Sequence, residues 1–148
     1  MDSQTQPAVL AESEVALAAA RERKQMLEQE LDRFVKILVE QENPELILIF
    51  GSLVTGEIHE WSDIDLVVVQ ETELPFMKRL HHLRGLLQPQ VGVDLLCYTP
   101  DEFDQMARER IFFKHEILGK GVVVYERGNP TMAGLRAGRL AHSRTRTH

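Results

Sequence analysis

Three aspartates and a Gly-Ser pair are the residues of this chain whose types and spacing are best suited to chemistry. Asp63 and Asp65 flank Ile64, at the start of a strand predicted over residues 64–70, whose apolar run is residues 66–69. Because side chains alternate across a strand, both carboxylates are expected on one face, close together. Two neighbouring carboxylates repel each other, and a divalent cation relieves that repulsion. Mg²⁺ suits them, since it takes oxygen ligands and keeps places for water and substrate phosphates.

Gly51 and Ser52, which precede Asp63 by a ten-residue segment, could bind the phosphate groups of a substrate. A glycine lets the backbone approach a bulky anion, and the Ser hydroxyl and following N–H groups can donate hydrogen bonds at a short helix N-terminus. Gly56 would permit the turn back toward the next strand. On a later apolar run, Asp94 stands between two apolar neighbours, where an unpaired carboxylate would be costly and a metal would relieve the cost.

Helices and strands are expected to alternate around these residues. Asn43-Pro44 ends a long helix, and Thr99, Pro100 and Glu102 form the pattern that begins another. The apolar runs predict strands at residues 46–50, 64–70, 91–98 and 122–125, with helices at 9–41, 75–87 and from 100 to 118. The fold class is therefore α/β or α+β around one sheet, and periodicity alone leaves the strand order open.

The first helix is expected to play two roles along its length. Residues 1–8 read as a frayed terminus, and the helix should run from about residue 9 to residue 41. Its second half, from Leu27, carries apolar residues at three- and four-residue steps and should cover a core. The first half should project, either as a solvated helix or as a contact for a partner or a second copy of the chain.

Length and composition favour one globular domain. The 148 residues, 43% of them hydrophobic, are enough for one core. We expect an N-terminal helical extension at residues 1–26, a domain at 27–126 and a basic, disordered tail at 127–148. The single cysteine, Cys97, excludes a disulfide within the chain and Cys-rich metal sites. No apolar run approaches the roughly 20 residues of a membrane span, so we expect a soluble, cytoplasmic protein.

Charge is distributed unevenly. The net charge is -6, but residues 127–148 carry five Arg and no acid, which leaves the remaining residues at -11. Broad nucleic-acid binding requires a basic face, so the acidic body argues against it. The tail could still contact a phosphate backbone, although a solvated end is the simpler interpretation.

The combined motifs resemble those of a known family. A Gly-Ser pair, a second Gly four residues after that Ser, Ser-Asp-x-Asp-Leu opening a strand and a later Val-Asp-Leu are similar to the minimal nucleotidyltransferases of the DNA polymerase β-like superfamily. The resemblance covers roughly residues 27–126. It implies a mixed sheet of about four strands flanked by helices, two Mg²⁺ ions, a nucleoside triphosphate substrate that is usually ATP, and nucleotidyl transfer with release of pyrophosphate.

The resemblance also implies a role for each matching residue. Gly51 and Ser52 would hold the β- and γ-phosphates, and Asp63 and Asp65 would bind both metals. Asp94 would complete the metal nearest the attacking hydroxyl and help to activate it. Two cations about 3.5–4 Å apart can stabilise the attacking and leaving oxygens together, which agrees with these roles. The alternative for Asp94 is a partly exposed carboxylate on an edge strand.

The acceptor is not encoded in these motifs, because they handle the triphosphate and metals that all acceptors share. The 22 residues after Glu126 are too few for an acceptor-binding domain. Members of the resembled family commonly pair with a helical HEPN-type toxin, so we expect AMP transfer to a hydroxyl of such a partner, with this chain as the antitoxin. The alternative is a non-catalytic nucleotide-binding module that neutralises the partner by covering it.

Other polar and aromatic residues near the motifs are interpreted as structural. His59 and Trp61, just before the Asp pair, are read as packing residues, with contact to a nucleobase as the alternative. Lys78, Arg79 and Arg84, in the helix between the second and third strands, are read as a solvated face, with contact to a phosphate as the alternative.

Overall fold

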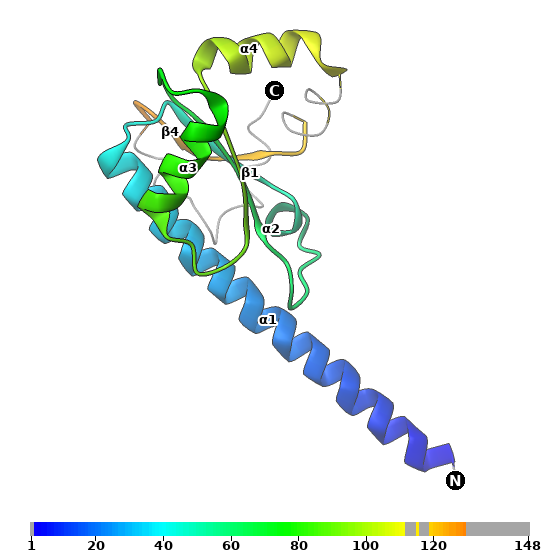
Figure 1. Ribbon diagram of the computed structural model, residues 1–148. Coiled ribbons are helices and arrows are strands. Elements are labelled where there is room, and N and C mark those ends of the chain that lie inside the picture. The colour runs from blue at the N-terminus through cyan, green and yellow to red at the C-terminus, as the bar shows by residue number, and fades with distance from the viewer. Residues whose placement is uncertain (1, 112–114, 116–118, 130–148) are drawn as a thin grey trace.

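The structure, a computed structural model, describes residues 2–111, 115 and 119–129, with the backbone alone for residues 2–12. Its elements are α1 (Asp2–Gln41), β1 (Leu46–Phe50), α2 (Ser52–Thr55), β2 (Ile64–Val69), α3 (Phe76–Leu87), β3 (Val93–Tyr98), α4 (Pro100–Glu109) and β4 (Val122–Glu126) (Figure 1). The alternation of helices and strands predicted from the sequence is confirmed.

The four strands form one mixed sheet in the order β3-β2-β1-β4. β1 pairs antiparallel with β2, to which residues 51–63 connect it, and on its other side with β4, which comes last in the element order. β2 and β3 are parallel, and α3 makes the crossover that a parallel pair requires. The mixed sheet expected from the family resemblance is therefore present, and β3 is one of its edges.

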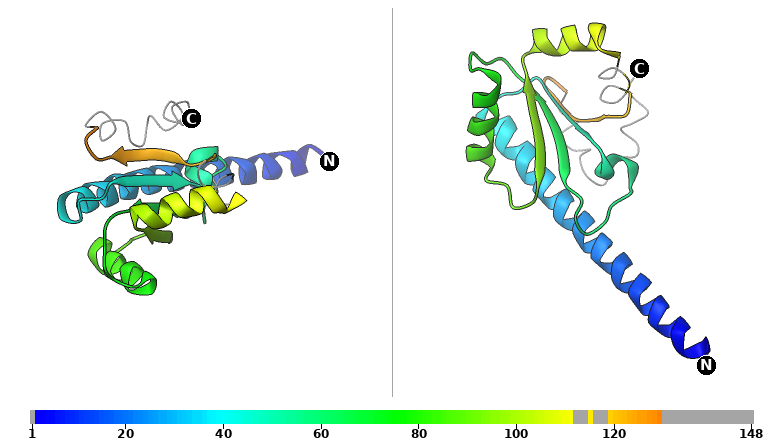
Figure 2. Two further views of the ribbon diagram at one scale, coloured as in Figure 1. Left: turned by 90° about the horizontal axis from the view of Figure 1, so that it is seen from above. Right: turned by 45° about the vertical axis from the view of Figure 1, so that its right-hand side comes forward.

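α1 is longer than predicted. It begins at Asp2 rather than at about residue 9, so it includes Pro7, which has no backbone N–H to donate. Its 40 residues correspond to about 60 Å. Figures 1 and 2 show the helix crossing the sheet and continuing well beyond it. Val15 and Leu17 in the projecting half are 67% and 59% exposed, so the prediction of a projecting first half is confirmed.

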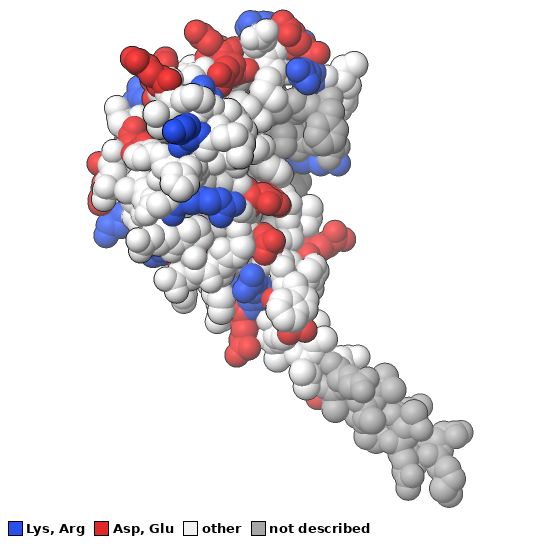
Figure 3. Space-filling view, viewed as in Figure 1, with Lys and Arg blue, Asp and Glu red and all other residues white. Residues whose placement is uncertain are grey.

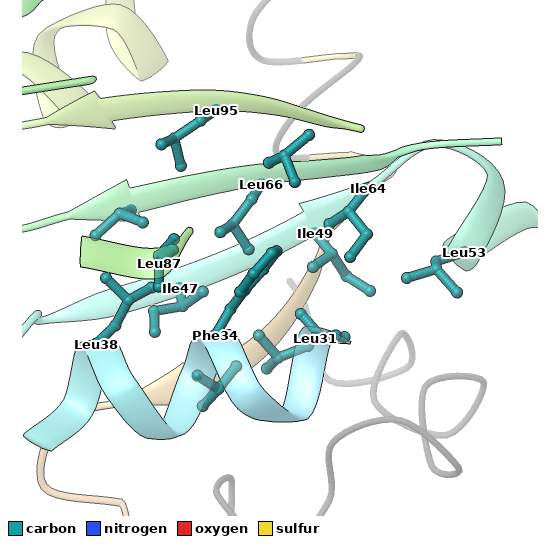
Figure 4. Close-up of a cluster of buried hydrophobic side chains, with 14 of the residues drawn as sticks. Leu31, Phe34, Leu38, Ile47, Ile49, Leu53, Ile64, Leu66, Leu87 and Leu95 are labelled. Carbon is teal, nitrogen blue, oxygen red and sulfur yellow. The ribbon is translucent and has the colours of Figure 1, made fainter. Parts of the chain in front are cut away.

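The second half of α1 covers one face of the sheet. Phe34 and its neighbours on the helix point toward the strands (Figure 4). α3 shares this face, whose buried core consists of Leu27, Leu31, Phe34, Leu38, Leu83 and Leu87 from the helices and Ile47, Ile49, Ile64, Leu66, Val68, Leu95 and Cys97 from the strands, among others. These apolar positions fall at helical spacing along α1 and at every second position along the strands.

Among the described residues, α4 packs on part of the opposite face. Phe103 of α4 packs against Leu48, Val67 and Val69, the residues that alternate with the larger core. Thr99 begins α4 with the predicted capping box: its Oγ1 accepts from the Glu102 N–H at 3.2 Å, and Glu102 accepts from the Thr99 N–H at 3.0 Å. Asp65 and Asp94 alternate with the core residues of their strands, so they belong to this second face.

Several predicted boundaries differ slightly from those observed. β2 ends one residue earlier and β3 begins two residues later than predicted, and β4 extends by one residue to Glu126. α3 begins at Phe76, with Pro75 as its N-cap in an extended conformation. The helix predicted from residue 100 is confirmed as far as Glu109, where α4 ends with Arg110 in an extended conformation. Residues 112–114 and 116–118 of the predicted helix, and the tail beyond residue 129, lie outside the described residues. In the described part of the chain, no helix is both long and apolar enough to cross a bilayer.

Candidate active site

The candidate site lies where β1 ends and where β2 and β3 begin. Phe50, the last residue of β1, pairs with Asp65, and Asp65 pairs in turn with Asp94 of β3. This register follows from the strand directions, since the end of β1 meets the start of its antiparallel neighbour β2, and β3 runs parallel to β2. Gly51, Asp65 and Asp94 are thereby brought to one end of the sheet.

Gly51 is required at this position for two separate reasons. Its φ of 78° lies in the region that favours glycine. In addition, a Cβ at this residue would overlap Oδ2 of Asp65, so only a glycine leaves room for that carboxylate. Gly56 closes the short helix α2 with a φ of 84°, and its N–H donates to the Ser52 carbonyl at 2.8 Å. The predicted turn at Gly56 is confirmed.

Asp65 and Asp94 form a tightly interacting pair of carboxyl groups. Partial burial, a hydrogen bond with Asp94 and the negative charges of Asp94 and Asp63 together raise the pKa of Asp65 to about 6. Asp94 is exposed on the edge strand β3, which agrees with the alternative of an exposed edge-strand carboxylate. Its carboxyl group also interacts with that of Asp65, its neighbour on β2. Two adjacent carboxylates that resist ionising together have the donor chemistry that Mg²⁺ prefers.

Asp63 occupies a different environment from the other two aspartates. Its carboxylate, half exposed, lies against Gly92, where a Cβ would overlap it. Nη2 of Arg23, from α1, lies 3.8 Å from Oδ1 of Asp63. Ile64 points into the core beneath α1, so the predicted separation of Ile64 from the flanking aspartates is confirmed.

The three aspartates therefore share one end of the sheet without forming a finished metal site. Among the residues that the structure describes, no three His, Cys, Asp or Glu side chains are close enough to hold one ion. Asp65 and Asp94 are paired, whereas Asp63 is directed toward Arg23. The assignment of all three as metal ligands, and of Gly51 and Ser52 as phosphate-binding residues, stays a prediction.

The loop before β2 is folded around Ser62. Its side chain is buried, its Oγ accepts from the His59 N–H at 3.0 Å, and its N–H donates to the His59 carbonyl at 3.0 Å. His59 Nδ1 accepts from the Trp61 N–H at 3.2 Å. The Trp61 side chain is 76% exposed, so its interpretation as a packing residue is wrong. A polar loop can order itself through such local hydrogen bonds without burying its aromatic side chain.

Arg79 also departs from its predicted role. It is buried, donates to the Leu74 carbonyl at 2.7 Å and to the Cys97 carbonyl at 3.2 Å, and forms an ion pair with Glu102 at 2.7 Å. Its interpretation as part of a solvated face is therefore wrong. The Arg79 guanidinium thus joins α3 to α4 and to the end of β3. It provides hydrogen-bond donors for polar groups that would otherwise lack a partner between these elements.

A pocket of about 240 Å³ lies along α4, away from the aspartates. Phe76, Tyr98 and Met106 supply its apolar lining, with Glu102 and Arg110 among its polar residues. Tyr98 ends β3 whereas Asp94 stands near its start, about 13 Å away along an extended strand. The pocket and the aspartate site are therefore separate features.

Charged side chains are interspersed on the face seen in Figure 3. Lys and Arg alternate with Asp and Glu across the described part of that face, and acidic side chains gather around α4.

Comparison with known proteins identifies the family. A proposed nucleotidyltransferase from Sulfolobus solfataricus matches with 20% identity and a TM-score of 0.54, over 74% of this chain and 88% of the other. A toxin-antitoxin structure with AMP-PNP matches at 19% identity and a TM-score of 0.42, over 76% and 82% of the two chains. The toxin-antitoxin MntA-HpeT matches at 19% and 0.41, over 73% and 80%. No curated protein matches in sequence.

The first of these structures shares the fold with this chain. The sequence profile of the family "Polymerase beta, Nucleotidyltransferase" matches residues 32–129, which contain β1 to β4 and all three aspartates. The family resemblance predicted from the motifs is thus confirmed, and the chain belongs to the polymerase β nucleotidyltransferase family.

Proposed function

We propose that this protein is a Mg²⁺-dependent nucleotidyltransferase that moves AMP from ATP to a hydroxyl group of a partner protein. The observation that carries the proposal is the Asp65–Asp94 pair, packed beside a glycine that leaves space for one of its carboxylates. A structural role alone would not favour two carboxyl groups whose joint ionisation is opposed. A cation at this point offsets their repulsion and supplies a function for the arrangement.

Each residue of the site has a proposed role. Asp65 and Asp94, joined by Asp63, would hold two Mg²⁺ ions, which when bound neutralise charge on the triphosphate and on the reacting oxygens. The Val54 and Thr55 N–H groups both donate to the Gly51 carbonyl at 3.0 Å. The β- and γ-phosphates would therefore be bound by the earlier donors of the turn, chiefly the Ser52 hydroxyl and N–H.

In the proposed reaction, the acceptor oxygen attacks the α-phosphorus of ATP and the bond to the β-phosphate oxygen breaks. Pyrophosphate leaves, and AMP remains on the acceptor as a phosphoester. The proton of the acceptor hydroxyl departs as the new bond forms, and Asp94, which is exposed at the sheet edge, would accept it. Because the reaction consumes ATP, we place it in the cytoplasm.

A protein acceptor is the finer part of the proposal. It rests on the motif resemblance to minimal nucleotidyltransferases, whose members commonly pair with HEPN-type toxins, and it makes this chain the antitoxin. Exposed apolar side chains beside the site suit such a partner. Trp61 is next to Ser62 in the loop before Asp63, and Met26 is 45% exposed, with its sulfur 3.6 Å from Nη1 of Arg23. The projecting half of α1 would extend the contact surface.

Co-expression of the chain with the HEPN-type protein encoded beside its gene, if one is present, would test the proposal. Intact mass spectrometry of the purified partner should show one or more added AMP units. Asp63→Asn and Asp65→Asn should each reduce the modification, and pyrophosphate release, by about 100- to 1,000-fold, because each removes a charge from a preorganised site. Asp104→Asn, at an exposed position of α4, is the matched control and should behave as the wild type.

The outcomes separate catalysis from simple binding. Wild-type activity in both site variants would contradict the metal assignment. A partner that is bound and inhibited but never modified would favour the alternative, a nucleotide-binding module that neutralises its partner by covering it. ATP binding without pyrophosphate release under any acceptor would support the same alternative.

A further inference from the structure

Arg23 is the residue of α1 that reaches the aspartate site. Its Nε donates to the Ser62 carbonyl at 2.8 Å, and its Nη2 lies 3.8 Å from Oδ1 of Asp63. The side chain is only 19% exposed, although the helix around it is largely solvated. An arginine that is mostly buried on a projecting helix and directs the Nε–Nη2 edge of its guanidinium to one loop has a specific structural task.

We propose that Arg23 is a positioning residue of the active site, which sets the orientation of Asp63 for metal binding. The inference rests on the proposed function, because it assumes that Asp63 is a metal ligand. Asp63 is fixed between Arg23 on one side and Gly92 on the other, where a side chain would overlap its carboxylate. A half-exposed carboxylate without these two contacts would sample several rotamers.

The planar guanidinium suits this role better than another cation would. One edge of the guanidinium serves both groups: Nε binds the Ser62 carbonyl and so holds the backbone just before Asp63, while Nη2 of the same edge faces the Asp63 carboxylate. A lysine offers a single point charge and cannot hold both groups in a fixed geometry. Partners that orient a metal ligand in this way typically affect metal affinity or activity by about 10- to 100-fold when removed.

Binding of Mn²⁺, followed by electron paramagnetic resonance with a non-hydrolysable ATP analogue present, would test the inference without reference to turnover. Arg23→Ala should weaken Mn²⁺ binding by about 10-fold or more. Arg23→Gln should weaken it similarly, because glutamine can still donate to Ser62 but carries no charge to face Asp63. Arg21→Ala is the control: it changes an exposed arginine two residues before Arg23 on α1, and the variant should bind Mn²⁺ as the wild type does.

Two further measurements exclude a merely structural effect. The thermal midpoint of the metal-free protein, and the affinity for the ATP analogue in EDTA, should be unchanged in Arg23→Gln. A parallel loss of thermal stability and analogue binding in both Arg23 variants would show that Arg23 only maintains the loop, and would overturn the inference. Tighter Mn²⁺ binding in these variants would overturn it too, because Arg23 would then act as a competing cation.

The failure of the inference can be distinguished from that of the proposed function. If the wild type does not bind Mn²⁺ with the analogue, the proposed function is contradicted and Arg23 has no metal ligand to position. If the wild type and both Arg23 variants bind Mn²⁺ equally, the proposed function stands and the role assigned to Arg23 is wrong.

Discussion

Replacement of Asp65 by asparagine should stabilise the metal-free protein at neutral pH. The pKa of Asp65 is raised from 3.8 to about 6 by partial burial and by its neighbouring aspartates, so ionisation is less favourable in the folded chain than in the unfolded chain. At about 1.4 kcal/mol per pH unit, this difference sets an upper limit of about 3 kcal/mol on the destabilisation at pH 7. The asparagine side chain is uncharged, and its amide can still donate a hydrogen bond to Asp94.

The pH dependence of this gain follows from the two protonation states. Between about pH 4 and pH 6 the folded wild type binds more protons than the unfolded chain, so its stability falls as the pH rises through this window. Below the window Asp65 is neutral in both states and the penalty is absent. The free energy of unfolding of the asparagine variant should therefore exceed that of the wild type by about 1–3 kcal/mol above pH 6, and by little near pH 4. The range extends below the upper limit because water reaches the partly exposed carboxyl group and reduces the penalty.

Urea denaturation in EDTA at pH 4.5, 5.5 and 7, for the wild type, Asp65→Asn and the exposed control Asp104→Asn, would measure the effect. Mg²⁺ with ATP should reverse it, since the ligand stabilises only the protein that binds it. Equal stability of Asp65→Asn and the wild type at pH 7, or a gain of the same size at pH 4.5, would refute the argument from carboxylate repulsion.

Four other substitutions probe separate parts of the structure. Gly92→Ala should lower pyrophosphate release at least about 10-fold, because the added Cβ would displace the Asp63 carboxylate. In Gly85→Ala of α3 the added Cβ would enter open space, so the free energy of unfolding measured in urea should rise by about 0.5–1 kcal/mol. Ser52→Ala should weaken ATP binding by about 1.5–3 kcal/mol in calorimetry while leaving AMP affinity nearly unchanged. Arg79→Leu should lower the free energy of unfolding by about 2–3 kcal/mol, because its carbonyl and carboxylate partners lose a charged donor.

The residues that could be predicted from the sequence are those whose roles depend on local pattern. Gly51 and Gly56 adopt positive φ, and Thr99 caps its helix, because turn and cap chemistry is decided within a few residues. Ile64 enters the core while its neighbours do not, because alternation along a strand is a local rule. The strands beside the site were therefore placed to within two residues.

The pairing of Asp65 with Asp94 could not be predicted in the same way. It depends on β3 lying next to β2, in parallel and in register, and periodicity carries no information on strand order. The family resemblance supplied that expectation instead. Arg79 and Trp61 were misread for a related reason: a polar residue in a helix and an aromatic residue in a loop have typical environments, and tertiary contacts decide whether each residue follows them.

The polar side of α1 shows what the hydrophobic pattern leaves out. Its apolar stripe predicted the buried half, but such a stripe carries no information on the contacts of the polar positions between its residues. In the fold, Arg23 reaches Ser62, while Glu30 accepts from the Gln90 N–H at 2.8 Å and Arg33 donates to the Gln88 carbonyl at 3.2 Å.

These contacts join α1 to both loops that lead into the aspartate-bearing strands. Residues 59–62 precede Asp63 and Asp65, and residues 88–92 precede Asp94. Arg23 lies 39 residues from Ser62, and Glu30 lies 60 residues from Gln90, so no short motif could reveal either contact. Because the same helix also packs on the sheet through Leu27, Leu31 and Phe34, it connects both loops that precede the carboxylates to the core of the domain.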